Sequence, residues 1–543
     1  MALRYWVTGG TGDYNSTTNW SASSGGASGA SVPTTADDAV WDASSGAGTV
    51  VINVASVAKS IDFTNFTGTV DFQDTLAVAG NMTLGTGMSF ANTTGTATLR
   101  VTATATLTSN GVAFPYNFSV LTAAATITLA DDWECNNFTH DVNTGNPVFN
   151  GNNFFINGNL SNLNTIRYIA GTTVFVMQGT GSVSTLYNSS NSYFTVNNLT
   201  INTSGTITFA TDLGGLSDVW TYTAGTVITS GMTLRLRGIF DLDGIVFENI
   251  NIPSTANTTL LSDLVYTGSF TTLSTPNSVN INGASVRHIG STGGFINLIG
   301  TPGGSTRLTG TTVLSLEGSG TFDTGGASGS IAIPVVVNTS GTYTVNAITS
   351  LNGTTFTYTA GTIDFSGVDV RMQHNNQTTT FNGISSLSFG QVSIGQTPNS
   401  VYVVLNDTMN VNTMLVKGTG SSVYFVNRIS GTAPFICNTL IFSSRAQIFE
   451  LQDGLNYVIN SAIKSAANNL IYTDVFFPKV KSTVNGSKAN ITLSPGATQE
   501  ISYCTFEDID ASNGQTLWVF GSLSTITNCD NINSFTQPKS VGF

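Results

Sequence analysis

Charged residues are scarce in this sequence of 543 residues. Only 9% of its residues are Asp, Glu, Lys or Arg, against about 25% in an ordinary globular protein. The 17 basic residues are outnumbered by 30 acidic ones, which gives a net charge of −13 at pH 7. Binding to the phosphates of nucleic acids needs concentrated Lys and Arg. The composition therefore predicts no nucleic-acid partner.

Long apolar runs are also missing. No run approaches the roughly 20 residues of a membrane-spanning helix, so no membrane insertion is predicted. The opening, MALRYWVTGG, lacks the apolar core of a signal peptide. On these grounds we expect the protein to be made in a cytoplasm. It would then stay there, leave by a route that needs no signal, or leave inside a particle.

Only four cysteines are present, and none stands in a Cys-x-x-Cys pair or at zinc spacing. They are Cys135, Cys437, Cys504 and Cys529. Cys504 and Cys529 stand in similar contexts, and Ile501 and Ile526 share their spacing. This spacing predicts a coil length of about 25 residues near the C-terminus. Burial as small hydrophobic residues in one interior row is favoured for both cysteines, and a disulfide is the alternative.

Specific catalytic motifs are absent. The sequence contains no P-loop, no Gly-x-Ser-x-Gly elbow and no His-Glu-x-x-His. The three histidines, His140, His288 and His374, lie far apart, and each is predicted to be an exposed side chain on a polar β surface. No catalytic, cofactor-binding or metal-binding residue is therefore assigned. Enzymatic activity stays open, and a non-enzymatic role is favoured.

What the sequence does contain is strand-forming residues and turns. Its 57 glycines alternate with Thr, Ser and Asn, and its 32 Phe and 15 Tyr are interleaved with Val, Ile and Thr. Such residues favour strands. Apolar and polar residues alternate plainly over Thr98–Thr108, which is typical of a half-buried strand. No convincing amphipathic helix is found, so the predicted fold class is all-β.

The clearest signal is an internal duplication. Gly171 to Gly238 recurs as Gly310 to His374, and both copies start with Gly-Thr-Thr-Val. Asn-Thr-Ser-Gly-Thr of 202–206 recurs at 338–342, Thr-Tyr-Thr-Ala-Gly-Thr of 221–226 recurs at 357–362 with the same offset, and Arg235 recurs as Arg371. Repeats built from short strands predict a parallel β-helix or β-solenoid, here with a super-repeat of about 139 residues. The super-repeats would cover 171–309 and 310–425, each with several coils of roughly 20–25 residues.

Two tyrosines occupy equivalent positions in these super-repeats. Tyr222 and Tyr358 are each followed by Thr-Ala-Gly-Thr, which is typical of a strand end and a turn. A structural stack of aromatic rings at a corner of the coil is favoured for them. A platform for sugar binding is the alternative.

The chain opens with an aromatic segment. Residues 1–60 contain Trp6, Trp20 and Trp41 and are predicted to cap the first coil, where apolar interior and strand edges would otherwise be exposed. Residues 61–455 would form the solenoid with its super-repeats, and 456–543 a further set of β-helix coils. The opening, RYWVTGGTGDYNSTTNW followed by VPTTADDAVWD, resembles that of β-helical structural proteins of tailed bacteriophages. It is also similar to the opening of autotransporter-type β-solenoid surface proteins.

The resemblance implies a function. It implies a virion structural appendage of a tailed phage, either a fibre, a spike or a surface-decoration protein, that contacts host-surface glycans and other virion proteins. It also implies a homotrimer located in the virion, and outside the cell as part of the particle. The alternatives are a secreted bacterial β-helical adhesin and a polysaccharide depolymerase tailspike.

A depolymerase would need two carboxylates about 5–9.5 Å apart. The candidates are Glu507, Asp508 and Asp510, and Asp241 with Asp243. Roles in turn geometry and solubility are favoured for them over catalysis. The same holds for Asp37 and Asp38, where a turn is favoured over a weak calcium site.

Overall fold

The computed structural model divides into two compact units, Met1–Leu264 and Val265–Phe543. The structure describes residues 2–535 except for short gaps. These gaps are 92, 94, 122–124, 141–146, 163–168, 186–195, 215–217, 253–256, 273–278, 298–305, 325–328, 346–347, 373–375, 396–399, 418–424, 443–446, 466–476 and 522–523.

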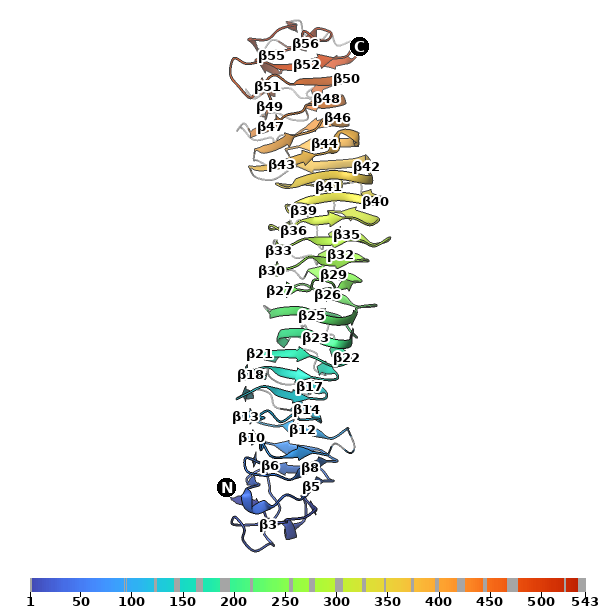
Figure 1. Ribbon diagram of the computed structural model, residues 1–543. Helices are drawn as coiled ribbons and strands as arrows, with labels where there is room; N and C mark the ends of the chain where they lie inside the picture. Colours follow the sequence, from blue (N-terminus) through green and yellow to red (C-terminus); the bar gives the residue numbers. More distant parts are fainter. Residues whose placement is uncertain are drawn as a thin grey trace, which may run out of the picture. The chain divides into compact units, whose positions relative to one another are not determined.

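Both units are parallel β-solenoids, which confirms the predicted fold class (Figure 1). Together they hold about 18 turns. The pairings from one coil to the next run parallel, whereas β1 (Leu3–Trp6) and β3 (Trp20–Ser21) pair antiparallel. Helical structure in the described residues is confined to three 3-10 turns. No helix in the described part of the chain is long and apolar enough to cross a membrane.

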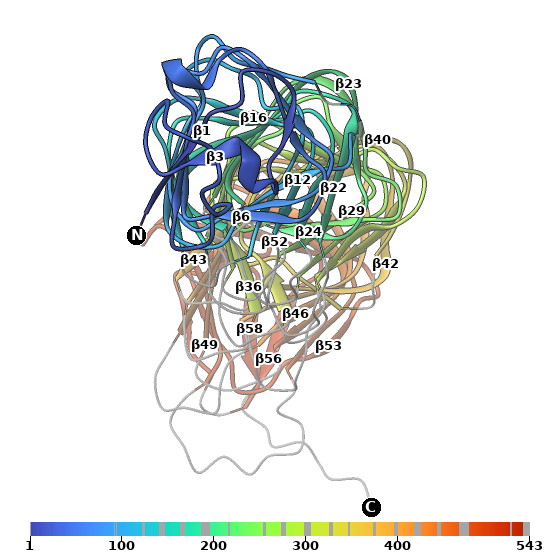
Figure 2. The same ribbon diagram turned by 90° about the horizontal axis from the view of Figure 1, so that it is seen from below.

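Each solenoid is built around columns of inward side chains, because successive residues of a strand point to opposite faces. One column in the first unit runs over β9 (Leu76–Val78), β12 (Thr98–Val101), β14 (Asn117–Val120), β17 (Phe138–His140) and β20 (Leu160–Asn162). Its members, Leu76, Leu99, Phe118, Phe138 and Leu160, are 0% exposed. Burying each such side chain contributes roughly 1.5–3 kcal/mol. Figure 2, which looks along the coils, shows the strands arranged around this interior.

The three N-terminal tryptophans form one buried cluster. Trp6, Trp20 and Trp41 are at most 1% exposed. The ring centroids of Trp20 lie 5.3 Å from Trp6 and 5.1 Å from Trp41, and Trp41 lies 4.3 Å from Phe63 in the following coil. Tyr14 packs edge-on against Trp20, and its hydroxyl donates to the carbonyl of Val57 at 2.9 Å. Aromatic side chains thus cover the first coil of this unit, as predicted.

The duplication is confirmed at the level of register. In the first copy (171–238), β23 (Val196–Phe209) pairs with β25 (Asp218–Ile228), with Ile201 opposite Tyr222. In the second copy (310–374), β40 (Val335–Val345) pairs with β42 (Thr355–Met372), with Val337 opposite Tyr358. The register shifts directly after these residues in both copies. The first copy lies in the first unit and the second copy in the second unit.

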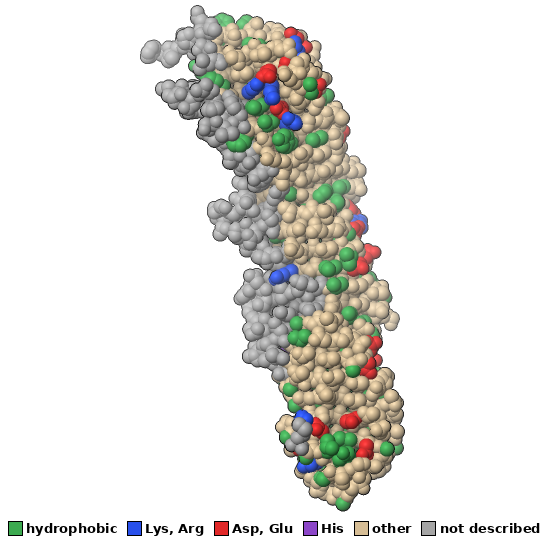
Figure 3. All heavy atoms as spheres, turned by 90° about the vertical axis from the view of Figure 1, so that its left-hand side faces the viewer, with side chains coloured by type: hydrophobic (Ala, Val, Ile, Leu, Met, Phe, Trp, Pro, Cys, Tyr) green, Lys and Arg blue, Asp and Glu red, His purple; other side chains and the backbone are tan. Residues whose placement is uncertain are grey.

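Four charged residues of the second unit and one tyrosine lie in one column. It runs over β45 (Val401–Leu405), β47 (Phe425–Gly431), β49 (Gln447–Leu451), β51 (Lys479–Ser482) and β54 (Thr505–Glu507). The residues paired across these strands are Tyr402, Arg428, Glu450, Lys481 and Glu507, which we call the charge column. Glu450 bonds Arg428 at 2.6 Å and Lys481 at 3.0 Å. Figure 3 shows acidic and basic side chains side by side near the C-terminal end of a largely uncharged surface.

The coil length predicted near the C-terminus is wrong. Phe506 pairs with Ile526, only 20 residues on, and the Ile509 amide donates to the sulfur of Cys529 at 3.4 Å. Cys504 is buried in the interior, but Cys529 is half-buried and does not occupy the same row. All four cysteines are free thiols. Coil length varies because the turns differ in length, and the coil that leads from Asn456 to its partner Asn490 is much longer.

Two histidines are buried, contrary to the prediction. His140 and His288 are both 0% exposed because they stand at inward positions of β17 and of β34 (Val286–His288). The Nε2 of His288 donates to the carbonyl of Thr292 at 3.0 Å, and its Nδ1 contacts the Tyr343 hydroxyl. Burial lowers the pKa of His288, which favours the neutral ring. His374 lies outside the described residues.

Candidate functional site

The carboxylates that the sequence suggested near the C-terminus are engaged in contacts between and within coils. Glu507 forms an ion pair with Lys479. Asp508 accepts from the Gly486 amide at 2.9 Å and from Asn528, and these bonds lower its pKa. Asp510 accepts from the Ser512 amide at 2.8 Å, which lowers its pKa in the same way. A general acid needs a raised pKa. The lowered pKa values of Asp508 and Asp510 therefore argue against that role and favour a role in turn geometry.

The remaining acidic candidates lie in the first unit. Asp241 ends β27 (Gly238–Asp241) and is half-buried, and Asp243 is exposed in the turn that follows. Asp37 accepts from the Thr34 hydroxyl at 2.7 Å, and Asp38 pairs with Lys59 at 3.1 Å. Among the described residues, no three acidic, His or Cys side chains come close enough to hold a metal ion.

The repeated tyrosines each form a hydrogen bond within their own strand. The hydroxyl of Tyr222 donates to the Gly225 carbonyl at 2.7 Å, and that of Tyr358 donates to the Gly361 carbonyl, also at 2.7 Å. Each bond spans the Thr-Ala-Gly-Thr segment of its own copy. The strand end and turn predicted after each tyrosine are wrong, because β25 (Asp218–Ile228) and β42 (Thr355–Met372) run through these segments. Among the described residues, neither tyrosine makes the predicted stack with another aromatic ring.

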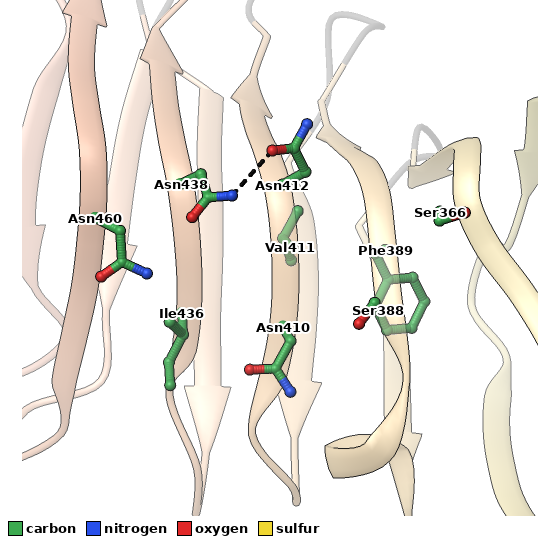
Figure 4. Close-up of a pocket in the computed structure, with 9 residues that line it drawn as sticks. All are labelled: Ser366, Ser388, Phe389, Asn410, Val411, Asn412, Ile436, Asn438 and Asn460. Carbon is green, nitrogen blue, oxygen red and sulfur yellow. Dashed lines mark hydrogen bonds between the residues drawn. The ribbon is translucent and has the colours of Figure 1, made fainter.

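A groove that the sequence analysis missed lies on the second unit. It consists of two hollows of about 410 and 300 Å³ that share Ser366 and Asn412. It crosses β42, β44 (Ser388–Ile394), β46 (Met409–Val416), β48 (Phe435–Phe442) and β50 (Asn456–Ser465). The larger hollow is lined by Ser366, Ser388, Phe389, Asn410, Val411, Asn412, Ile436, Asn438 and Asn460 (Figure 4). The smaller is lined by Ser366, Gly367, Val368, Asp369, Gly390, Gln391, Asn412 and Thr413. We call this feature the amide groove.

The amides reach the surface because the alternation of inward and outward side chains along β46 and β48 is interrupted at this point. On β46, Asn412 and Thr413 both face outward between two buried residues, and on β48 Asn438 and Thr439 repeat the arrangement. The amides are therefore brought into one row across neighbouring coils. Asn438 Nδ2 donates to Asn412 Oδ1 at 3.1 Å (Figure 4), and Asn460 Oδ1 accepts from Ser494 at 3.0 Å.

Much of the hydrogen-bonding capacity of this row remains unused. Among the described residues, Asn412 Nδ2, Asn438 Oδ1 and Asn460 Nδ2 make no hydrogen bond. An amide offers both donors and acceptors. The groove crosses five strands, which at a spacing of about 4.8 Å extends roughly 19 Å, and the row of amides covers three of them, roughly 10 Å. It therefore suits an elongated ligand with many neutral polar groups.

Charge is confined to one end of the groove. No charged side chain lines the larger hollow, and Asp369 is the one that lines the smaller hollow. Burial alone would raise the pKa of Asp369, but hydrogen bonds from Ser393, Arg371 and Gln391 outweigh burial and lower it. The lining thus offers binding groups and no pair of carboxylates for hydrolysis.

The sequence did carry a signal for this groove. Asn412, Asn438 and Asn460 recur once in each successive coil. In so Asn-rich a chain, that recurrence becomes distinctive only once the register is known. No family model, curated protein or solved structure significantly matches the chain.

Proposed function

We propose that this chain is a virion structural appendage of a tailed phage, a fibre, spike or surface-decoration protein, that binds host-surface glycans through the amide groove. The row of partly unpaired amides formed by Asn412, Asn438 and Asn460 carries the proposal. The β-solenoid fold and the resemblance of the first residues to phage proteins support the setting in a virion.

The chemistry of the groove favours sugars over most other ligands. Sugar hydroxyls donate and accept hydrogen bonds, and amides that do both complement them without a charge. A hydrophobic ligand that covered these exposed amides would separate them from water without pairing them, at a cost of about 1–3 kcal/mol for each. Half-buried Ile436 supplies some apolar contact for the faces of sugar rings.

The binding test uses the full-length chain and a panel of neutral and acidic oligosaccharides. We expect Asn412→Ala with Asn438→Ala to weaken binding at least ~10-fold, because two to three hydrogen bonds of about 0.5–1.5 kcal/mol each are lost. The matched control is Asn406→Ala, since Asn406 also donates to a neighbouring amide, Asn382 Oδ1 at 2.8 Å, but outside the groove. Equal binding by both variants would overturn the proposal.

The homotrimer and the location in a virion need separate tests. A trimer would show about three times the 56.7 kDa mass of one chain in light scattering, and would resist SDS until heated. Copurification with phage particles would support the appendage, whereas recovery from bacterial surfaces would favour the adhesin. A depolymerase would release reducing ends and would lose that activity in one of Glu507→Gln, Asp508→Asn, Asp510→Asn, Asp241→Asn or Asp243→Asn.

A further inference from the structure

The smaller hollow of the groove has an ionic cluster beside it. Asp369, which lines this hollow, accepts from Ser393 Oγ at 2.6 Å with one oxygen and from Arg371 Nε at 2.6 Å with the other. Both carboxylate oxygens are therefore occupied. Among the described residues, the terminal nitrogens of the Arg371 guanidinium make no hydrogen bond.

A second cation faces the same side of the sheet. Met372, Ile394 and Val416 are paired across three successive coils and are 0% exposed. Arg371 directly precedes this inward row on β42 and therefore points to the outer face, because side chains alternate along a strand. Lys417 directly follows the row at the end of β46 and is likewise not fully buried. Burial lowers the pKa of Lys417, Asp369 raises it, and the charge of Arg371 lowers it again. The positive charges of Arg371 and Lys417 are thus close enough to repel each other.

Lys417 is exceptional among the cations of its unit. The other basic side chains that the structure describes between 265 and 535 each have a carboxylate partner within 4 Å; these are Arg287, Arg371, Arg428, Lys464, Lys479, Lys481 and Lys488. Lys417 has no such partner in the described part of the chain. The chain has a net charge of −13. The Lys417 ammonium, four residues beyond groove residue Thr413, is available to a negatively charged ligand.

One further carboxylate lies near the groove. Asp364 belongs to β42, where it precedes Asp369, and accepts from the amide of Ser366 at 2.8 Å. Asp364 is thus held by the backbone of its own strand. At the cation pair, Arg371 is bonded to Asp369, whereas Lys417 is bonded to no carboxylate among the described residues.

We propose that Arg371 and Lys417 bind an acidic group of the glycan in the amide groove, which makes the ligand class an acidic polysaccharide. Hydroxyls of the chain bond Asn412 and Asn438, and an anionic substituent bonds the free guanidinium nitrogens and the ammonium. Charge-assisted bonds of this kind are stronger than neutral ones. This inference rests on the proposed glycan binding and adds the charge of the ligand to it.

The test compares matched ligands that differ only in charge. Oligogalacturonate and its methyl ester share one sugar backbone, and dextran sulfate and dextran provide the same comparison for a sulfate. We expect calorimetry on the full-length chain to show at least ~10-fold tighter binding of one acidic member than of its neutral partner. The difference should shrink at high salt, because a charged contact near the surface is screened.

Variants locate the effect. Lys417→Gln should abolish most of the preference for the acidic ligand without affecting the fold, because no ion pair of the described residues depends on Lys417. Lys464→Gln is the matched control, since Lys464 is half-exposed and pairs with Glu500 at 3.6 Å. Binding of neutral members alone, or an acidic preference that survives Lys417→Gln, would overturn this inference and leave the proposed function standing. Binding of no member would overturn both.

Discussion

The two copies of the duplication agree in one half and differ in the other. In the half that agrees, Thr203 Oγ1 donates to the Gly179 carbonyl and accepts from the Gly205 amide. Thr339 repeats both contacts with the equivalent glycines, 318 and 341. The tyrosine bonds repeat as well. Both copies also place a glycine at positive φ inside the long strand, with φ +117° at Gly225 and +105° at Gly361.

The super-repeats also differ just after the two copies. Glu248, which follows the first copy, accepts from the Gly231 amide at 2.6 Å, where the chain makes a turn. The equivalent residue after the second copy is Gly390, which lines the amide groove beside a continuous strand β42. A Cβ atom at Gly390 would collide with the Ser366 carbonyl. The same repeat thus carries a turn in the first unit and a groove in the second unit.

The arginine that recurs has also changed its partner. Arg235 pairs at 3.3 Å with Asp212 of the preceding coil, whereas Arg371 pairs at 2.6 Å with Asp369 of its own strand. The equivalent positions in the other copy, Thr233 and Ile348, carry no charge. Both copies thus have an arginine at this position, but in the second copy its carboxylate partner lies at the edge of the groove.

The largest effect is expected at the two glycines that both copies share. Gly225→Ala and Gly361→Ala should each destabilise the fold by at least about 1–3 kcal/mol, because a side chain is strained at these positive φ values. The added methyl group would also press on Thr203 or Thr339. Denaturant unfolding should show similar losses, with Gly9→Ala, which meets no neighbour, as the control. Unequal losses of unfolding free energy would show that the two glycines do not have equivalent roles in the two copies.

The arginines should give a smaller and unequal effect. Arg371→Gln leaves the Asp369 carboxylate, 13% exposed, short of a partner, and should cost about 1–3 kcal/mol. Arg235→Gln should cost less, because Asp212 is 28% exposed. Denaturant unfolding of the two variants beside the parent would measure both losses, and a larger loss for Arg235→Gln would reverse the comparison.

The stability of the fold should depend on pH through Asp369. The pKa of Asp369 is lowered in the fold, so its stabilisation is present above about pH 3.9 and is lost as the pH falls through the folded value. Arg371→Gln should shift that loss to higher pH. Unfolding curves at pH 7 and pH 3 would measure it, and identical acid profiles of variant and parent would contradict the assignment.

The tyrosine hydroxyls should give the smallest effect. Tyr222→Phe and Tyr358→Phe each remove one bond to a glycine carbonyl, which should cost about 0.5–1.5 kcal/mol. Equal losses in thermal unfolding would sharpen the comparison between the copies. A marked loss of glycan binding by Tyr358→Phe would instead favour the alternative role as a sugar platform.

These contrasts explain what the sequence could predict. The duplication and the parallel solenoid were predictable because repeated segments impose repeated backbone geometry. The bond that Tyr222 and Tyr358 each make to a glycine carbonyl was not predicted. The groove was not predictable either, because it depends on Gly390 standing where the first super-repeat has Glu248, and on paired outward residues such as Asn412 and Thr413. The coil length near the C-terminus was predicted wrongly because Cys504 and Cys529 are not in the same row, and turn length follows no pattern of residue types.

The charge column has a consequence for how the chain reaches its fold. Strands rich in Thr, Ser and Asn resemble one another, so a growing stack could add the wrong strand. If the strand of Glu450 were skipped, Arg428 would face Lys481 at about 4.8 Å, with a repulsion of roughly 1–4 kcal/mol. Omitting the strand of Lys481 would likewise place Glu450 against Glu507. The charge column therefore favours the native order of these strands over an order in which one of them is skipped.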